Sequence, residues 1–231
     1  MIDTRPLVIA HRGASAAFPE NTVAAFAGAR DLGADAVELD ARRTADDHIV
    51  VHHDAHLADG RAIVDLAAAA LPSSIPSLAE AVDASDGMAV NIEIKNWPAD
   101  PDFDEDQRVA DAVLALAAGS DRRSELLVSC FHLPTIDHVR AGDPALETAL
   151  LHAVIDGATA LAMALEHGHH VLHPWDQDVT AELVTAAHAA GVRVNVWTVD
   201  DPARMAELIA WGVDGIVTNV PDVARRVVDE G

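Results

Sequence analysis

The stretch IAHRGASAAFPENTVAAF, from Ile9 to Phe26, contains a strand, a turn and a helix start in succession. A short apolar run leads into a turn that contains glycine, and a Pro-Glu-Asn-Thr sequence then offers a helix cap before an alanine-rich run. A strand-to-helix connection needs the glycine and the cap. Folding does not require a histidine next to an arginine at the end of the strand, so His11 and Arg12 are the first candidates for a functional role.

Units of the same kind recur along the chain. Helical patterns follow eight β-branched runs, which are LVIAH (7–11), AVELDA (36–41), AVNIEIK (89–95), LLVSCF (126–131), ETALLH (147–152), HVLHP (170–174), VRVNVWT (192–198) and GIVTN (215–219). Gly33, Gly191 and Gly212 stand after helical stretches, where a left-handed C-terminal cap is favoured. Eight strand-helix repeats with no linker between them predict an α/β fold, a TIM (β/α)8 barrel, with residues 1–231 as a single domain.

The segment from Ala41 to Ser77 is longer than a simple connection between a strand and a helix. Its sequence HIVVHHD (48–54) predicts an extra short strand that returns a histidine to the mouth of the barrel. Ser77 and Glu80 form a plausible capping box for the helix that follows.

Composition excludes several classes of partner. The formal charge is −23, which argues against binding to nucleic acid or to an anionic membrane because both require a basic surface. No apolar run is long enough to cross a bilayer, the N-terminus has no signal pattern, and the single cysteine, Cys130, allows no internal disulfide. We therefore expect a soluble, cytoplasmic protein in which Cys130 is a small buried residue, and in which any anionic substrate meets a local positive site.

Alternation along three of the strands places polar residues on one face. Successive side chains of a strand point to opposite sides, so the aliphatic positions are expected beneath the helices and the polar positions inside the barrel. The polar positions are Glu38 and Asp40; Asn91, Glu93 and Lys95; and Arg193, Asn195 and Trp197. Barrel interiors are normally filled by aliphatic side chains, so this pattern indicates a site.

Three carboxylates inside a barrel repel one another and are costly to bury without a cation. One solution is an ion-pair network in which Lys95, the only lysine of the chain, and nearby arginines neutralise them. The other is a metal site in which Glu38, Asp40 and Glu93 hold a hard divalent ion, Mg²⁺ or Ca²⁺, rather than zinc. The spacing alone leaves both solutions open.

The order and spacing of these motifs resemble the glycerophosphodiester phosphodiesterase family. The resemblance rests on His-Arg-Gly, Pro-Glu-Asn-Thr, Glu-x-Asp, Val-Val-x-His-Asp and Glu-x-Lys, and on VNVWTVDDPARMAELIAWGVDGIVTNVPD near the end of the chain. It implies a TIM barrel that hydrolyses a small-molecule glycerophosphodiester to glycerol 3-phosphate and an alcohol with the help of a divalent cation.

The same resemblance implies roles for individual residues. His11 and His53 match the acid-base pair of the family, and Glu38, Asp40 and Glu93 match its metal ligands. The implied phosphate contacts are Arg12 and Lys95, and Trp197 is expected to line the glycerol or head-group pocket or to serve in the core.

The sequence also contains other histidines, and it leaves other activities as alternatives. His52 is expected at the surface or in packing, and His167, His169, His170 and His173 are expected to be exposed near a strand end. The rival activities are a phosphodiesterase of the lysophospholipase D or sphingomyelinase type and a catalytically silent barrel that binds a phosphorylated metabolite. The low aromatic content argues against the lipid-cleaving phosphodiesterase. The presence of both His11 and His53 argues against the silent binding protein. The choice between Mg²⁺ and Ca²⁺, the alcohol, the nucleophile, the assignment of acid and base, and the oligomeric state do not follow from the sequence.

Overall fold

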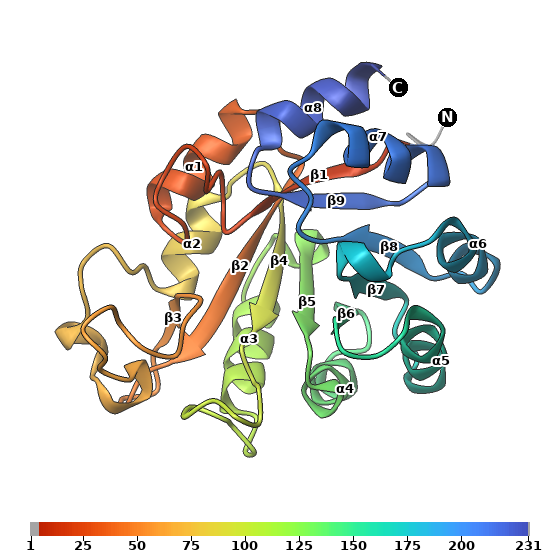
Figure 1. Cartoon of the computed structure of the whole chain (residues 1–231). Helices are drawn as coiled ribbons and strands as arrows, with labels where there is room; N and C mark the ends of the chain where they lie inside the picture. The colour runs from red at the N-terminus through yellow and green to blue at the C-terminus, as the bar shows by residue number, and fades with distance from the viewer. Residues whose placement is uncertain (1–4, 231) are drawn as a thin grey trace.

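The computed structural model describes residues 5–230, which form a closed barrel of parallel strands surrounded by helices (Figure 1). The strand order is β1-β9-β8-β7-β6-β5-β4-β2-β3, and an additional pairing of β1 with β2 closes the ring. Every pairing within the ring is parallel, whereas β3 pairs with β2 in the antiparallel direction and stays outside the ring. The predicted TIM barrel is confirmed.

Eight of the nine strands within residues 5–230 correspond to the eight runs identified in the sequence. The strands are β1 (Leu7–His11), β2 (Ala36–Arg43), β3 (Ile49–Val51), β4 (Ala89–Ile94), β5 (Leu126–Cys130), β6 (Glu147–His152), β7 (Val171–Pro174), β8 (Arg193–Val196) and β9 (Gly215–Thr218). The α-helices are α1 (Val23–Asp31), α2 (Leu78–Ala84), α3 (Arg108–Ala118), α4 (Leu133–Gly142), α5 (Gly157–His167), α6 (Ala181–Ala189), α7 (Pro202–Trp211) and α8 (Pro221–Glu230). Short 3₁₀ turns complete the chain as η1 (Ile63–Asp65), η2 (Ala68–Ala70), η3 (Arg123–Glu125) and η4 (Asp176–Asp178).

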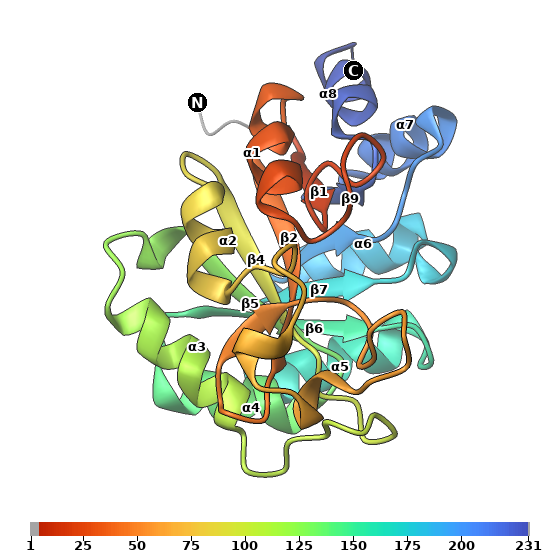
Figure 2. The same cartoon turned by 90° about the vertical axis from the view of Figure 1, so that its left-hand side faces the viewer.

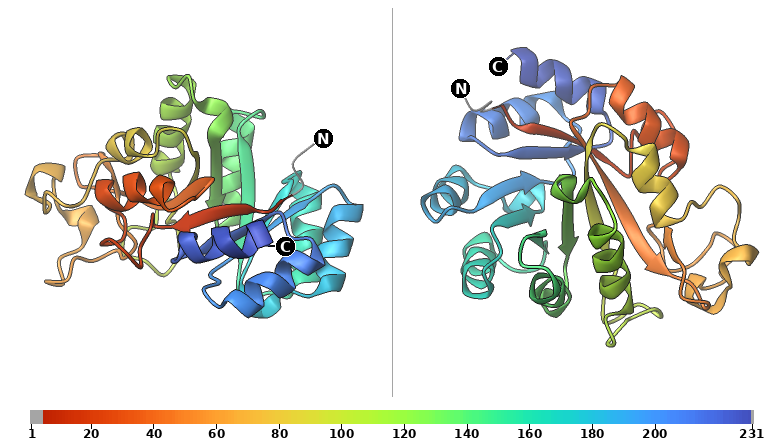
Figure 3. Two further views of the ribbon diagram at one scale, coloured as in Figure 1. Left: turned by 90° about the horizontal axis from the view of Figure 1, so that it is seen from above. Right: turned by 180° about the vertical axis from the view of Figure 1, so that it is seen from behind.

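The main hydrophobic core lies between the outer face of the barrel and the helices, which surround the strands in both views of Figure 3. Val37 and Leu39 of β2 belong to this core, as do Ile92 and Ile94 of β4. The residues between them therefore face the inside of the barrel, as alternation predicts. Because the aliphatic side chains of β2 and β4 pack against the helices, the carboxylates between them point into the barrel.

The expected helix ends are present. The φ angles of Gly33, Gly191 and Gly212 are 83°, 75° and 85°, which is the left-handed conformation expected after a helix. Ser77 caps α2, and Ser77 and Glu80 form both hydrogen bonds of the capping box. Local sequence therefore determines where these helices stop and where α2 begins.

The segment between β2 and α2 forms an excursion beside the barrel (Figure 2). It contains β3, η1 and η2, and it has a small hydrophobic cluster of its own around Val50, Leu57 and Ile63. β3 is the extra short strand predicted from HIVVHHD, and it ends two residues before His53. The excursion therefore delivers His53 to the carboxyl end of β2.

Two expectations from composition can be compared with the structure. Within residues 5–230, none of the helices combines the length and the apolarity needed to cross a membrane. Cys130 is a free, buried cysteine, and burial raises the pKa of its thiol to about 12, so it is a small core residue as predicted.

The prediction that the histidines near residue 170 are exposed is wrong for two of them. His169 is fully buried, and both of its ring nitrogens have partners: Thr148 Oγ1 lies 2.7 Å from Nδ1 and Asp137 Oδ1 lies 2.9 Å from Nε2. His173 is buried inside the barrel, where Asn195 Nδ2 lies 3.0 Å from its Nε2. Hydrogen bonds from distant parts of the chain compensate for burying these polar rings.

Candidate active site

The His-Arg-Gly sequence forms the sharp turn at the carboxyl end of β1. Arg12 and Gly13 both have positive φ angles, 56° and 77°. A Cβ atom on Gly13 would lie 2.6 Å from the carbonyl carbon of Ala25 in α1, closer than side chains can approach backbone. The glycine is therefore required so that His11 and Arg12 can leave the strand at the barrel mouth.

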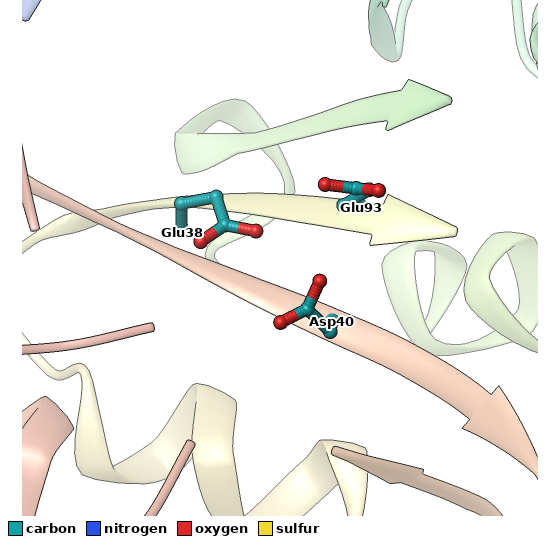
Figure 4. Close-up of side chains that lie close together, drawn as sticks. All are labelled: Glu38, Asp40 and Glu93. Atoms are coloured by element: carbon teal, nitrogen blue, oxygen red, sulfur yellow. The ribbon is translucent and has the colours of Figure 1, made fainter. Parts of the chain in front are cut away.

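The three predicted carboxylates come together. Glu38 and Asp40 project from β2 and Glu93 from β4, with Asp40 and Glu93 paired in register. All three are buried, and one carboxylate oxygen from each lies within 4.8 Å of the others. Figure 4 shows the three side chains close together. The cluster is the consequence of strand alternation on two neighbouring parallel strands.

Cations of the chain partly neutralise this cluster. Lys95 Nζ lies 2.8 Å from Glu93 Oε1 and 3.5 Å from Asp40 Oδ1, and Arg12 Nε lies 3.3 Å from Asp40 Oδ2. Asn21 Nδ2 donates a hydrogen bond of 2.7 Å to Asp40 Oδ2. Burial alone would raise the pKa of Asp40, but Lys95 and Arg12 outweigh it and lower the pKa, so Asp40 is ionised.

Glu38 is the carboxylate that the chain leaves incompletely satisfied. Its Oε2 accepts a hydrogen bond of 2.9 Å from the backbone N–H of Arg12, whereas its buried Oε1 has no partner among the described residues. Burial first, and then the charges of Asp40 and Glu93, raise the pKa of Glu38 well above its usual value. An unpartnered oxygen in a cluster of three carboxylates is the environment that a hard divalent cation suits, so these residues fit such an ion.

His11 is held in one tautomer by a chain of hydrogen bonds. Asn219 Nδ2 donates to Asp200 Oδ2 at 2.7 Å, which fixes the amide so that Asn219 Oδ1 accepts from His11 Nδ1 at 2.8 Å. The lone pair is then on Nε2 of the neutral ring. Burial, assisted by the charge of Arg12, lowers the pKa of His11, so the ring is neutral and able to accept a proton at neutral pH.

His53 reaches the same cluster from the excursion. The backbone N–H of His52 donates to the carbonyl of Asp40 at 2.9 Å, and His53 Nδ1 lies 2.7 Å from Asp54 Oδ1. His53 helps to lower the pKa of Asp40, while Asp40 and Glu93 act to raise that of His11, so both imidazoles are electrostatically coupled to the carboxylates.

Trp197 lies beside the carboxylate cluster. It borders a cavity of about 20 Å³ together with His11, Glu38 and Glu93. Its Nε1 donates to the carbonyl of His173 at 2.7 Å, and its ring makes an edge contact with Phe131 at 5.6 Å between centroids. Trp197 is therefore held in the barrel wall and borders the cavity, and its contact with the glycerol or the head group stays a prediction.

Several residues around the site were not singled out as functional from the sequence. Asn21 and Asn219 hold Asp40 and His11 respectively, and Asn91 and His173 form the inner wall of the small cavity. The signals were weak: Asn21 is part of Pro-Glu-Asn-Thr, which also reads as a helix start, and Asn219 is 208 residues away from His11. Desolvation lowers the pKa of His173 to about 3, so this ring is a neutral structural group.

Comparisons with known proteins agree with this geometry. The model of the glycerophosphoryl diester phosphodiesterase family matches residues 11–223. A glycerophosphodiester phosphodiesterase of Caldanaerobacter subterraneus subsp. tengcongensis is 31% identical over 98% of this chain and 99% of that protein. The solved glycerophosphodiester phosphodiesterase of Thermotoga maritima is 27% identical, with a TM-score of 0.81 over 96% of this chain and 98% of that one. An Oleispira antarctica phosphodiesterase, solved in complex with the product sn-glycerol-3-phosphate, shares the fold with a TM-score of 0.88 at 24% identity over 97% of each chain.

Proposed function

The chain belongs to the glycerophosphoryl diester phosphodiesterase family, and from that premise we propose that its barrel-mouth site hydrolyses glycerophosphodiesters to glycerol 3-phosphate and an alcohol. The observation that carries the proposal is the meeting of two histidines, two cations and three buried carboxylates at the carboxyl ends of β1, β2 and β4. The family is one of phosphodiesterases, and this site has the groups that such a reaction needs.

Glu38, Asp40 and Glu93 are proposed to hold a divalent cation, Mg²⁺ or Ca²⁺. The unpartnered Oε1 of Glu38 and the raised pKa of its carboxyl group support this assignment, since a bound cation would relieve both. When bound, the cation supplies positive charge that polarises the phosphate and stabilises the charge that develops in the transition state.

Arg12 and Lys95 are proposed to bind the phosphate. Arg12 presents a planar set of donors, of which Nη1 is paired with the exposed Glu20 at 3.0 Å. Lys95 is a point charge whose pKa is raised, because Glu93 and Asp40 outweigh the effect of burial, so it stays protonated. In a chain of net charge −23 these two residues provide the local positive site that an anionic substrate requires.

The two histidines are proposed to divide the proton transfers. His11 is neutral and carries its lone pair on Nε2, which suits it to take a proton from the nucleophile. His53 is more exposed, and its Nδ1 lies 2.7 Å from Asp54 Oδ1, a contact that holds the ring in place. We assign it the delivery of a proton to the departing alkoxide. Two separate imidazoles are needed because one proton leaves while another arrives.

A substrate panel tests the proposed function. Glycerophosphocholine, glycerophosphoethanolamine and glycerophosphoglycerol are incubated with the purified protein and a divalent cation, and glycerol 3-phosphate is measured by a coupled dehydrogenase assay. Lysophosphatidylcholine and sphingomyelin serve as the contrasting substrates. Release of glycerol 3-phosphate is expected; turnover of the two lipids alone, or of nothing under any cation, would contradict the proposal.

A further inference from the structure

Arg42 is a buried cation that lies next to the site without contacting the carboxylate cluster. It is two residues beyond Asp40 on β2, and its side chain is 3% exposed. Alternation places Glu38, Asp40 and Arg42 on the same face of the strand, with Arg42 at the outer end. A buried arginine needs a counter-charge and hydrogen-bond acceptors for the N–H groups of its guanidinium. The groups that bind Arg42 therefore indicate what it does.

One partner is the backbone of His53. Arg42 Nε donates to the carbonyl oxygen of His53 at 2.8 Å. The residue before it is bound in a similar way, since the N–H of His52 donates to the carbonyl of Asp40 at 2.9 Å. These two hydrogen bonds attach the backbone at His52 and His53 to β2, and the one from Arg42 comes from a side chain.

The remaining donors of Arg42 bind the loop between β4 and α3. Nη1 contacts both carboxylate oxygens of Asp102, at 2.8 and 2.7 Å, and Nη2 lies 3.0 Å from Asp100 Oδ2. Asp102 is itself buried, whereas Asp100 is partly exposed. One guanidinium thus joins the excursion that carries His53 to the loop that begins at Lys95.

That loop is a rigid support. Asn96 Nδ2 donates to the carbonyl of Asp104 at 3.1 Å and to Thr135 Oγ1 at 2.9 Å, and Asn96 Oδ1 accepts from the N–H of Asp104 at 2.8 Å. Asp104 Oδ2 accepts from the N–H of Val109 at the start of α3. The anchor for Arg42 is therefore fastened to β4, α3 and α4.

We propose that Arg42 is a positioning residue for His53: its guanidinium fixes the backbone carbonyl of His53 to the loop after β4 and so sets the place of the imidazole relative to the carboxylates. This inference rests on the proposed function, in which His53 transfers a proton. Arginine is required because its planar fork serves three directions at once, whereas a lysine at this position reaches Asp102 or the carbonyl of His53 but not both with good geometry.

The test is the conservative substitution Arg42→Lys, which keeps a positive charge beside Asp102. Arg43→Lys is the matched control, because Arg43 is the next residue of the same strand and pairs with Asp47, with no bond to His53. The kinetic constants kcat and KM for glycerophosphocholine are measured with the divalent cation present. Imidazole resonances of His53 are followed by NMR in cation-free protein, with His53→Gln used for assignment.

Arg42→Lys is expected to lower kcat at least about tenfold with KM changed less than about twofold, since misplacing a catalytic group affects the chemical step. The His53 resonances are expected to shift or broaden in Arg42→Lys and to stay in place in Arg43→Lys. A role in stability alone would lower the melting temperature and leave both readouts unchanged.

Equal kcat values and unshifted His53 resonances in Arg42→Lys and Arg43→Lys would overturn the inference. If Arg42→Lys does not fold, Asp100→Asn weakens the anchor at a partly exposed position, and a smaller loss of kcat is expected; no loss would overturn the inference as well. An unmodified protein that releases no glycerol 3-phosphate counts against the proposed function instead, and the NMR comparison still decides whether Arg42 positions His53.

Discussion

Replacing Glu38 by glutamine should stabilise the cation-free protein while it weakens cation binding. The amide oxygen of Glu38→Gln can still accept the hydrogen bond from the backbone of Arg12, and its NH₂ group places a donor where the carboxylate has an unpartnered oxygen. The substitution also removes one of three negative charges from a buried cluster. Both effects favour the folded state when no cation is present.

The size of the effect follows from the spacing of the cluster. Two unit charges 4.8 Å apart repel by about 3.5 kcal/mol at an effective dielectric constant of about 20. Glu38 faces two such charges, but Arg12 opposes them and protonation of Glu38 limits the repulsion because its pKa is raised. We expect a net gain of about 1–3 kcal/mol in the free energy of unfolding at neutral pH, or a rise in melting temperature of roughly 2–10 °C.

If charge repulsion in the cluster is the cause, the stability difference between the two proteins should depend on pH and on the cation. A carboxyl group whose pKa is raised in the folded state costs stability above that pKa and nothing below its unfolded value of 4.5, so the advantage of Glu38→Gln should vanish as the pH falls toward 4.5. A cation at 100 times its Kd should stabilise the unmodified protein by about 2.7 kcal/mol, and it should stabilise Glu38→Gln far less.

The assay is thermal and urea unfolding of both proteins in EDTA and in Mg²⁺ or Ca²⁺, at several pH values. The electrostatic explanation of this cluster would be refuted if Glu38→Gln were less stable than the unmodified protein in EDTA. It would also be refuted if the cation stabilised Glu38→Gln as much as it stabilises the unmodified protein.

Three further predictions concern the histidines and the turn after β1. His11→Ala and His53→Ala should each lower kcat by about 10²- to 10⁴-fold and still bind the cation. Glu93→Ala should lose both the activity and the binding of the cation. Calorimetric titration with the cation checks this, and failure of either histidine variant to bind the cation would contradict the prediction. His173→Gln should flatten the pH dependence of the free energy of unfolding. The pKa of His173 in the unmodified protein is about 3, so that protein loses about 1.4 kcal/mol of stability per pH unit as the pH falls from about 6 to about 4. Urea unfolding of both proteins over that range measures the difference, and parallel curves would contradict the prediction. Gly13→Ala should destabilise the fold by about 1–3 kcal/mol, because its Cβ would lie 2.6 Å from the backbone of α1 at a positive φ angle, and an unchanged melting temperature would show that the turn relaxes freely.

The sequence predicts the barrel and the carboxylate cluster because both depend on local periodicity. Alternation alone places Glu38, Asp40 and Glu93 inside the ring, and pairing of β2 with β4 brings them together. The two open explanations of the cluster turn out to be compatible. Lys95 and Arg12 neutralise part of its charge, and Glu38 is left with an oxygen that suits a cation.

The supporting hydrogen bonds could not be predicted because they join segments that meet only when the barrel closes. Asn219 reaches His11 across the pairing of β9 with β1, the two ends of the described chain. Asp102 lies in an irregular loop with no periodicity to indicate that it binds Arg42. The polar sequence around His169 predicts a surface position, and only the folded chain brings Asp137 and Thr148 within hydrogen-bond distance of its ring.

The most direct test of the account is release of glycerol 3-phosphate from glycerophosphocholine by protein treated with EDTA and then supplied with Mg²⁺ or Ca²⁺. Release is expected to stop in EDTA, to return with the cation, and to stay absent in Glu93→Ala under the same cation. Release that persists in EDTA, or that returns equally in Glu93→Ala, would contradict the claim that the carboxylate cluster of the barrel mouth holds the cation on which hydrolysis depends.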